Sequence, residues 1–159
     1  MQALEFTDDG FGEVRQRAEV LYFALDRIRC PYLENDVHFN TDGFRHLLFK
    51  NWNRGRDRRD QFMRLKFLSR APEILRLSRT VQGIQTTNEW QRRRRHGRWE
   101  KLLVPVTYYE FIAVIEKRRF KVIVKCLHAG QHIFWSVIPF WRQDEQGSRL
   151  LHNGTPATD

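Results

Sequence analysis

The clearest pattern of apolar and polar positions lies between residues 108 and 140. Three runs rich in β-forming residues are separated there by short polar connections: Tyr108–Glu116, Phe120–Leu127 and Ile133–Phe140. In the middle run apolar and basic positions alternate, so a strand would point Phe120, Val122, Val124 and Cys126 one way and Lys121, Ile123, Lys125 and Leu127 the other. The alternation predicts a sheet with one apolar face and one basic face.

Upstream of these strands, apolar residues recur at intervals of three and four, which is the spacing of one face of a helix. The spacing predicts helices at about Glu13–Arg29, Gly43–Asn51, 58–69 and Pro72–Thr80. Pro31 would end the first helix, Thr41 or Asp42 would cap the second, and Asp57 would cap the third.

After Gly83 the apolar residues no longer follow the spacing of a helix, and two β-forming segments flank a basic stretch. Ile84–Trp90 and Trp99–Val106 predict a hairpin with His96 and Gly97 near its tip. Because helices come first and strands last, we expect an α+β fold with N-terminal helices followed by a twisted antiparallel sheet of four to five strands. Residues 1–146 would form a single α+β domain, and the polar residues 147–159 would form a loose tail.

Composition narrows the class of protein. Five Trp and 12 Phe argue against a disordered chain, and two cysteines make neither a disulfide framework nor a metal-binding spacing. The sequence contains neither an N-terminal signal pattern nor an apolar run long enough to cross a bilayer, so we expect a cytoplasmic protein without a membrane partner. Lys and Arg number 28 and Asp and Glu 19, and the net charge of +9 favours a polyanionic partner. Composition alone does not separate nucleic acid from a membrane surface, and the interleaved aromatic residues favour nucleic acid such as RNA.

Basic residues gather in three places. The clusters are Arg54, Arg56, Arg58 and Arg59; Arg92, Arg93, Arg94 and Arg95 with Arg98; and Lys117, Arg118, Arg119, Lys121 and Lys125. A surface that combined them would attract phosphates and lose affinity in salt. Each cluster is equally explained as the solvated face of a basic protein. We take Arg92–Arg95, Arg118, Arg119 and Lys50 as candidate nucleic-acid contacts.

Motifs for metal, nucleotide or serine-hydrolase chemistry are absent: the sequence contains no HExxH, Walker loop, GxGxxG or GxSxG. We therefore expect no metal and no cofactor. RNA can be cleaved without either, because its own 2′-hydroxyl can attack the adjacent phosphate. The protein would have to supply proton transfer and stabilise the charge that develops on phosphorus.

The candidate catalytic residues are His46, Lys121, Lys125, Ser136 and Tyr108. His46 lies opposite the apolar stripe of its helix, next to Lys50, so we expect its ring not to be buried and to transfer protons. A surface histidine is the alternative. The two lysines would stabilise phosphate charge. Ser136 would bind a phosphate oxygen, or else satisfy the edge of the sheet.

Strand alternation makes two further predictions about these positions. Ser136 should share a face with Phe134 and Ile138, opposite Trp135 and Val137. Tyr108 and Tyr109 should point to opposite faces, so only one of them can approach a substrate, by stacking on a base or placing its hydroxyl near phosphate.

A family resemblance is carried by Asn40–Leu48 (NTDGFRHLL), Tyr108–Glu110, Phe120–Lys125 and Ile133–Pro139. In these segments, which together span about residues 40–140, the chain resembles the phage and mobile-element nucleases of the barnase, EndoU, colicin and RelE (BECR) superfamily. The resemblance implies helices followed by a four-stranded antiparallel sheet and metal-independent RNA cleavage, often by a toxin. It places the helix histidine at His46, the strand cation at Lys125 or Lys121, and the last-strand hydroxyl at Ser136. The Arg-rich hairpin does not align with the family.

Three functions follow as hypotheses. The first is a metal-independent, toxin-like endoribonuclease that leaves a 2′,3′-cyclic phosphate. The second is a module that binds RNA or DNA without cleaving it. The third is an interaction protein whose basic face meets an acidic partner, such as an immunity or antitoxin protein. Cleavage of RNA in EDTA would separate the first from the other two.

Overall fold

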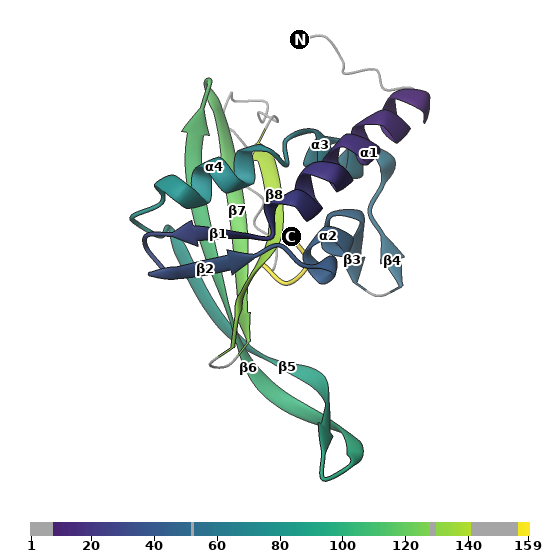
Figure 1. Cartoon of the computed structure of the whole chain (residues 1–159), viewed down its shortest axis with the longest axis vertical. Helices are drawn as coiled ribbons and strands as arrows, with labels where there is room; N and C mark the ends of the chain where they lie inside the picture. Colours follow the sequence, from purple (N-terminus) through teal and green to yellow (C-terminus); the bar gives the residue numbers. More distant parts are fainter. Residues whose placement is uncertain (1–7, 52, 128–129, 141–155) are drawn as a thin grey trace, which may run out of the picture.

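The computed structural model describes residues 8–51, 53–127, 130–140 and 156–159. Its helices are α1 (Asp8–Leu25), α2 (Thr41–Leu48), α3 (Arg58–Lys66) and α4 (Arg70–Leu77). Its strands are β1 (Arg27–Cys30), β2 (Asn35–His38), β3 (Phe49–Asn51), β4 (Arg54–Gly55), β5 (Gly83–Arg95), β6 (Arg98–Ile115), β7 (Arg118–Leu127) and β8 (His132–Phe140). Figure 1 shows the helices gathered around the upper part of a sheet from which the β5–β6 hairpin projects downward.

The main sheet has six strands in the order β1-β2-β8-β7-β6-β5, and β3 and β4 form a separate two-stranded ribbon. The predicted α+β class is confirmed. The sheet is larger than predicted and mixed, because β2 runs parallel to β8 while the other neighbours are antiparallel. The two additional strands lie where the sequence predicted the end of the first helix and a loop. Asp26 has a φ of 56°, which ends α1 before the four-residue strand β1 begins.

The hairpin is longer than the sequence predicted. Trp99–Val106 and Tyr108–Glu116 were expected as separate strands, whereas β6 is one strand of 18 residues that runs through both segments. Pro105 is tolerated because it lies in the part of β6 that pairs with β5 alone. At the tip, His96 and Gly97 have φ values of 51° and 77°, as a two-residue hairpin turn of the favoured hand requires.

The main core lies between the helices and one face of the sheet. Phe120, Val122 and Val124 of β7 are buried in it, as the alternation predicted. Phe134 of β8 is fully buried against the rings of Tyr22 and Phe39. Burial of one such aromatic side chain contributes about 2–3 kcal/mol.

The opposite face of the sheet has a second, smaller apolar cluster rather than an open basic surface. Val106, Tyr108, Ile123 and Ile138 are buried there, and Trp135, Leu127 and Ala157 pack against them. Lys121, on the same face, is only 5% exposed. The alternation of β7 is therefore confirmed, but its lysines lie among apolar neighbours.

Helix α2 lies directly against the backbone of β8. Its N-cap is Asn40, not Thr41 or Asp42, because the Asn40 side chain accepts a hydrogen bond from the Gly43 backbone N–H at 3.0 Å. A Cβ at Gly43 would lie less than 3.0 Å from the backbone oxygen of Phe134. A glycine is thus what allows α2 to approach the strand so closely.

Candidate functional site

A β-bulge in β8 sets the geometry of the site. Ile123 of β7 pairs with Ser136 and the next residue, Val124, pairs with Phe134, so Trp135 is the additional residue of the bulge. Phe134 and Val137 enter the helix-side core, whereas Trp135 packs on the opposite face. The prediction that Ser136 shares a face with Phe134 is therefore wrong. Strict alternation does not hold across the bulge, and Ser136 joins Trp135 on the face of the lysines.

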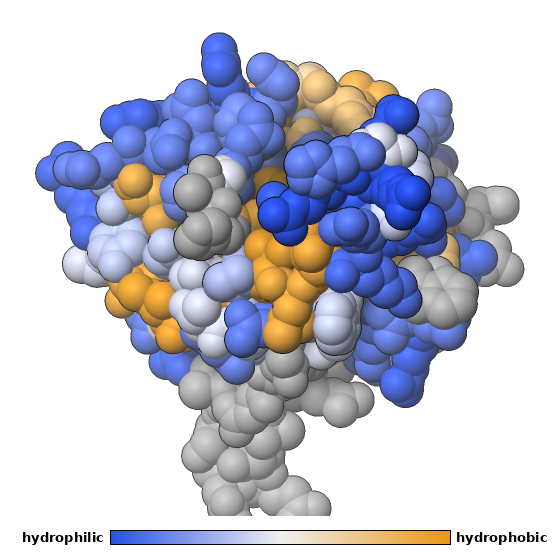
Figure 2. Space-filling view, turned by 90° about the horizontal axis from the view of Figure 1, so that it is seen from below, coloured by the Kyte–Doolittle hydropathy of each residue, from blue (hydrophilic) through white to orange (hydrophobic). Residues whose placement is uncertain are grey.

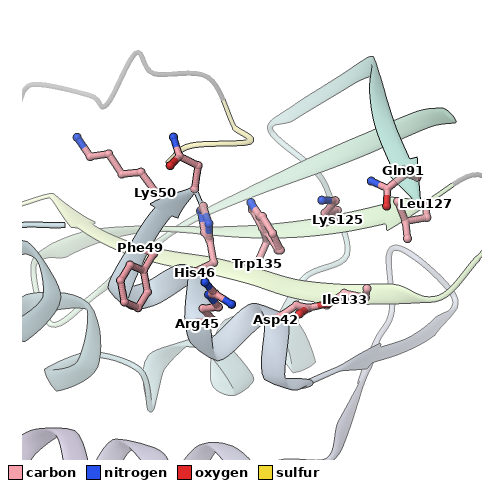
Figure 3. Close-up of a pocket in the computed structure, with 11 residues that line it drawn as sticks. Asp42, Arg45, His46, Phe49, Lys50, Gln91, Lys125, Leu127, Ile133 and Trp135 are labelled. Atoms are coloured by element: carbon pink, nitrogen blue, oxygen red, sulfur yellow. The ribbon is translucent and has the colours of Figure 1, made fainter. Parts of the chain in front are cut away.

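Trp135 is the centre of the arrangement. The imidazole of His46 stacks on its ring with a centroid separation of 4.2 Å and an interplanar angle of 18°. The Lys125 ammonium lies 4.2 Å from the ring centroid, and Figure 3 shows Trp135 between His46 and Lys125. The Trp135 Nε1–H donates to the backbone oxygen of Ala157 at 3.1 Å, which fixes the ring in its plane.

His46 is only 4% exposed, so the expectation that its ring would not be buried is wrong. The ring does lie away from its helix's apolar stripe, but that side of α2 packs against the bulge. Arg56 donates to His46 Nε2 and to its backbone oxygen, both at 3.0 Å. Burial, followed by the charges of Arg56, Arg64 and Lys125, lowers the pKa of His46 to about 2. The imidazole is therefore neutral at pH 7.

Both lysines of β7 have carboxylate neighbours on other strands of the sheet, Lys121 on β6 and Lys125 on β5. Lys125 Nζ lies 3.2 Å from a Glu89 carboxylate oxygen, and Lys121 Nζ lies 3.5 Å from Glu110. Tyr108 lies on the same face and donates its hydroxyl to Glu89, and burial is the main cause that raises its pKa. These carboxylates were missed because only the register across three strands brings them to the lysines.

Tyr109, by contrast, packs near Tyr32 and His132. Of the two candidate tyrosines, Tyr108 is therefore the one that shares a face with Lys125. Its hydroxyl, however, is already bound to Glu89, and its ring is buried.

Two buried arginines complete the site and were not singled out as site residues by the sequence. The Arg56 and Arg64 side chains are each 1% exposed, and both contact the carboxylate of Asp60. Arg64 donates to the Ser136 hydroxyl. Burial and the neighbouring Arg64 lower the pKa of Arg56 to about 10. From the sequence alone, Arg64 looks like an ordinary surface residue of its helix. Only the packing of α3 beside β8 shows that it binds Ser136.

Residues 156–159 lie against this site. Ser136 Oγ donates to the Asp159 backbone oxygen at 3.0 Å, and Arg56 donates to the backbone oxygens of Thr158 and Asp159, both at 3.0 Å. These contacts differ from the loose tail expected for this segment. The rest of that predicted tail, 147–155, falls outside the described residues.

An open pocket of about 260 Å³ adjoins the His46–Trp135 stack. Three predicted residues line it, namely His46, Lys50 and Lys125, and Figure 3 shows their side chains around the cavity. The rest of its lining is Asp42, Arg45, Phe49, Asn51, Gln91, Leu127, Ile133 and Trp135. The pocket therefore combines cations, aromatic rings and amides, which is a lining suited to a nucleotide.

The predicted nucleic-acid contacts divide into two groups. Arg92–Arg95 are all exposed and follow directly after Gln91, so the hairpin continues outward from the pocket rim. Arg118 and Arg119 begin β7, about 20 Å from Lys125 at the other end of the strand, and they do not line the pocket. Figure 2, which looks toward the hairpin end, shows a mainly hydrophilic surface with separate hydrophobic areas.

Two exposed tryptophans accompany the hairpin arginines. Trp90 and Trp99 are 67% and 65% exposed, and the Arg92 guanidinium lies 5.8 Å from the Trp99 ring centroid. Exposed aromatic rings beside arginines are typical of surfaces that hold unpaired bases and phosphates. Sequence composition alone could not show that these rings face solvent.

Within the described residues, no group of three or more His, Cys, Asp or Glu is placed to hold a metal ion. No helix in that part of the chain is long and apolar enough to cross a membrane. No protein-family model matches the sequence, and no curated protein or solved structure matches it.

Proposed function

We propose that the protein is a metal-independent endoribonuclease, toxin-like in its chemistry, that cleaves RNA through attack of the substrate's own 2′-hydroxyl. The observation that carries the proposal is the bulge at Trp135. It places Ser136 on the same face of the sheet as Lys121 and Lys125, at the point where α2 delivers His46. The imidazole of His46 and the ammonium group of Lys125 line the open pocket, and Lys121 and Ser136 lie buried on the same face of the sheet outside its lining. Together these groups could supply the functions that phosphoryl transfer without a metal requires.

The proposed reaction begins with the 2′-oxygen attacking the adjacent phosphorus while its proton passes to a base. The bond from phosphorus to the 5′-oxygen then breaks, and that oxygen takes a proton from water as it leaves. The products are a 2′,3′-cyclic phosphate and a 5′-hydroxyl. Lys125 and Lys121 would stabilise the extra charge on the phosphorane, which exceeds the charge of the bound substrate.

In this proposal His46 is the group that takes the proton, because its imidazole is neutral and lines the pocket. Its Nε2 can accept that proton once Arg56 turns from it to the bound phosphate. A base with a pKa of about 2 would be weak. After burial, the charges of Arg56, Arg64 and Lys125 depress that pKa, and a bound phosphate supplies negative charge close to them. Substrate binding would therefore shift the His46 pKa upward, towards the range in which imidazole transfers protons effectively.

The pocket and the hairpin would hold the RNA. A nucleotide next to the scissile phosphate would enter the pocket, near Phe49 and Gln91. The exposed arginines at 92–95 would contact phosphates farther along the strand. The hairpin should therefore affect affinity and its salt dependence rather than the rate of bond breaking.

The test is incubation of the protein with RNA in excess EDTA, followed by analysis of the new ends. We expect fragments ending in 2′,3′-cyclic phosphate, and no cleavage of the same sequence carrying 2′-deoxyribose at the cleaved position. His46→Gln should lower the rate at least as much as Lys125→Gln. Intact RNA at high protein concentration would overturn the proposal.

The second candidate is a nucleic-acid-binding module without catalysis, and the state of His46 is what favours it. Its Nε2 is engaged by Arg56 at 3.0 Å and its pKa is low, as expected for a buried structural imidazole. This function predicts binding that weakens with salt, persists in His46→Gln and never produces shorter RNA. Binding with the hairpin arginines intact and no scission in any buffer would favour it.

A further inference from the structure

The buried arginine pair has one more charge than its carboxylate neighbour balances. Arg56 and Arg64 are each 1% exposed at the side chain, and Asp60 is the acidic side chain that both contact, at 3.5 Å and 2.7 Å. A buried charge without a counter-charge costs several kcal/mol. In the part of the chain that the structure describes, Asp60 is thus the carboxylate that forms ion pairs with both guanidinium groups, and the charge of Asp159 also acts on Arg56.

The oxygens of Asp159 and Thr158 lie where a further anion would bind. The Asp159 backbone oxygen accepts hydrogen bonds from Arg56, Arg64 and Ser136. Its side-chain carboxylate lies 3.8 Å from Lys121 Nζ. One acidic residue therefore presents several oxygens to two guanidinium groups, a hydroxyl and an ammonium group.

We propose that Arg56, Arg64, Ser136 and Lys121 form a phosphate-binding subsite and that Asp159 occupies it as an intramolecular competitor. The donor set matches a phosphate group, because guanidinium forks bind its oxygens in pairs and a hydroxyl and an ammonium group serve the remaining ones. This subsite rests on the proposed function for its biological use, as the place for a phosphate of the RNA. Its existence can be measured without RNA.

The subsite is linked to the candidate base through a single side chain. One guanidinium nitrogen of Arg56 contacts His46 Nε2, and the same group contacts the Asp159 backbone oxygen, both at 3.0 Å. A phosphate that replaced Asp159 would sit one guanidinium away from the imidazole. RNA would therefore have to displace residues 156–159 before its phosphate could bind Arg56 and Arg64, and this segment acts as an autoinhibitory contact.

The test measures binding of inorganic phosphate by calorimetry to the full chain and to a chain shortened by residues 156–159. We expect the shortened chain to bind phosphate about tenfold more tightly, the equivalent of one charge-assisted hydrogen bond. Adding Arg64→Gln to the shortened chain should abolish the gain. The matched control is Arg17→Gln in the shortened chain, because it removes the same charge from an exposed position of α1. This variant should keep the gain in phosphate affinity.

Equal phosphate affinity of the full and shortened chains would overturn the proposal, as would tight binding that survives Arg64→Gln. If the shortened chain does not fold, the full chain is titrated with phosphate while the Trp135 indole N–H is followed by NMR. Displacement of Ala157 from Trp135 should shift that signal, and a signal that stays in place throughout the titration contradicts competition. Because no RNA is present, absence of ribonuclease activity would reject the proposed function and leave this result standing.

Discussion

Replacement of Gly43 by alanine tests how the site is assembled. Gly43 is the position at which α2 meets β8, and an added Cβ would lie less than 3.0 Å from both the Phe134 backbone oxygen and the Tyr22 hydroxyl. Neither atom can move freely. The first belongs to a strand in the middle of the sheet, and the second is held by its 2.6 Å hydrogen bond to the Asn40 backbone oxygen. The helix itself must therefore shift, and it carries His46 one turn farther along.

The cost can be bounded from two opposing effects. Forcing a methyl group into a packed interior costs about 1–3 kcal/mol. Alanine in place of glycine within a helix returns about 1 kcal/mol. We expect Gly43→Ala to lower the free energy of unfolding by up to about 2 kcal/mol, measured by urea denaturation with circular dichroism. The shift of α2 should also loosen the His46–Trp135 stack and reduce RNA cleavage.

Gly12→Ala is the matched control, since Gly12 is an exposed position of α1 at which an added Cβ meets nothing within 4 Å. It should raise the free energy of unfolding by about 0.5–1 kcal/mol through helix propensity alone. Comparing the two variants separates the steric effect of the added Cβ at Gly43 from the effect of helix propensity, which both share. If Gly43→Ala proves as stable as Gly12→Ala, α2 does not pack on β8 as described, and the positioning of His46 needs another cause.

Three further predictions concern charge. The pKa of His46 is about 2 in the folded protein and near 6.5 in an unfolded chain, so the unfolded state binds the proton first as pH falls. The free energy of unfolding should therefore fall below about pH 6.5, by up to about 1.4 kcal/mol per pH unit. His46→Gln should flatten urea-derived stability against pH in that range, and identical slopes would contradict the low pKa. Lys125→Gln should lower kcat for RNA cleavage more than it raises KM, in steady-state assays; an effect confined to KM would mean that Lys125 only binds. Arg94→Gln should do the reverse and reduce the slope of log affinity against log salt by about one, and an unchanged slope would show that this side chain does not contact phosphate.

Local patterns of the sequence predicted much of the fold. The order of the four helices before the strands β5–β8, the alternation of β7, the Asp57 cap and the His96–Gly97 turn all depend on neighbouring residues, and the structure has each of them. The four-residue strands β1 and β2 are too short to show a period. Their place in the sheet follows from pairing between Val37 and His132, which are distant in sequence.

The sequence predicted which residues belong to the candidate site better than it predicted their surroundings. His46 and Lys125 both contact the Trp135 ring, because helix and strand spacing sets the side on which each residue lies, whereas Ser136 reaches that face only through the bulge. The bulge was not predictable, since strict alternation is the default and one inserted residue reverses it. The burial of His46 depends on Arg56, which reaches it from a different element.

The position of β5 at one end of the sheet has a consequence for how copies of this protein behave toward one another. A terminal strand of 13 residues offers a row of backbone groups that a second copy could join. Consecutive arginines at 92–95 make such a meeting repulsive in dilute salt. The same guanidinium groups that would hold a polyanion thus also keep the molecules apart, and a polyanion or concentrated salt that neutralises them removes this protection against edge-to-edge association.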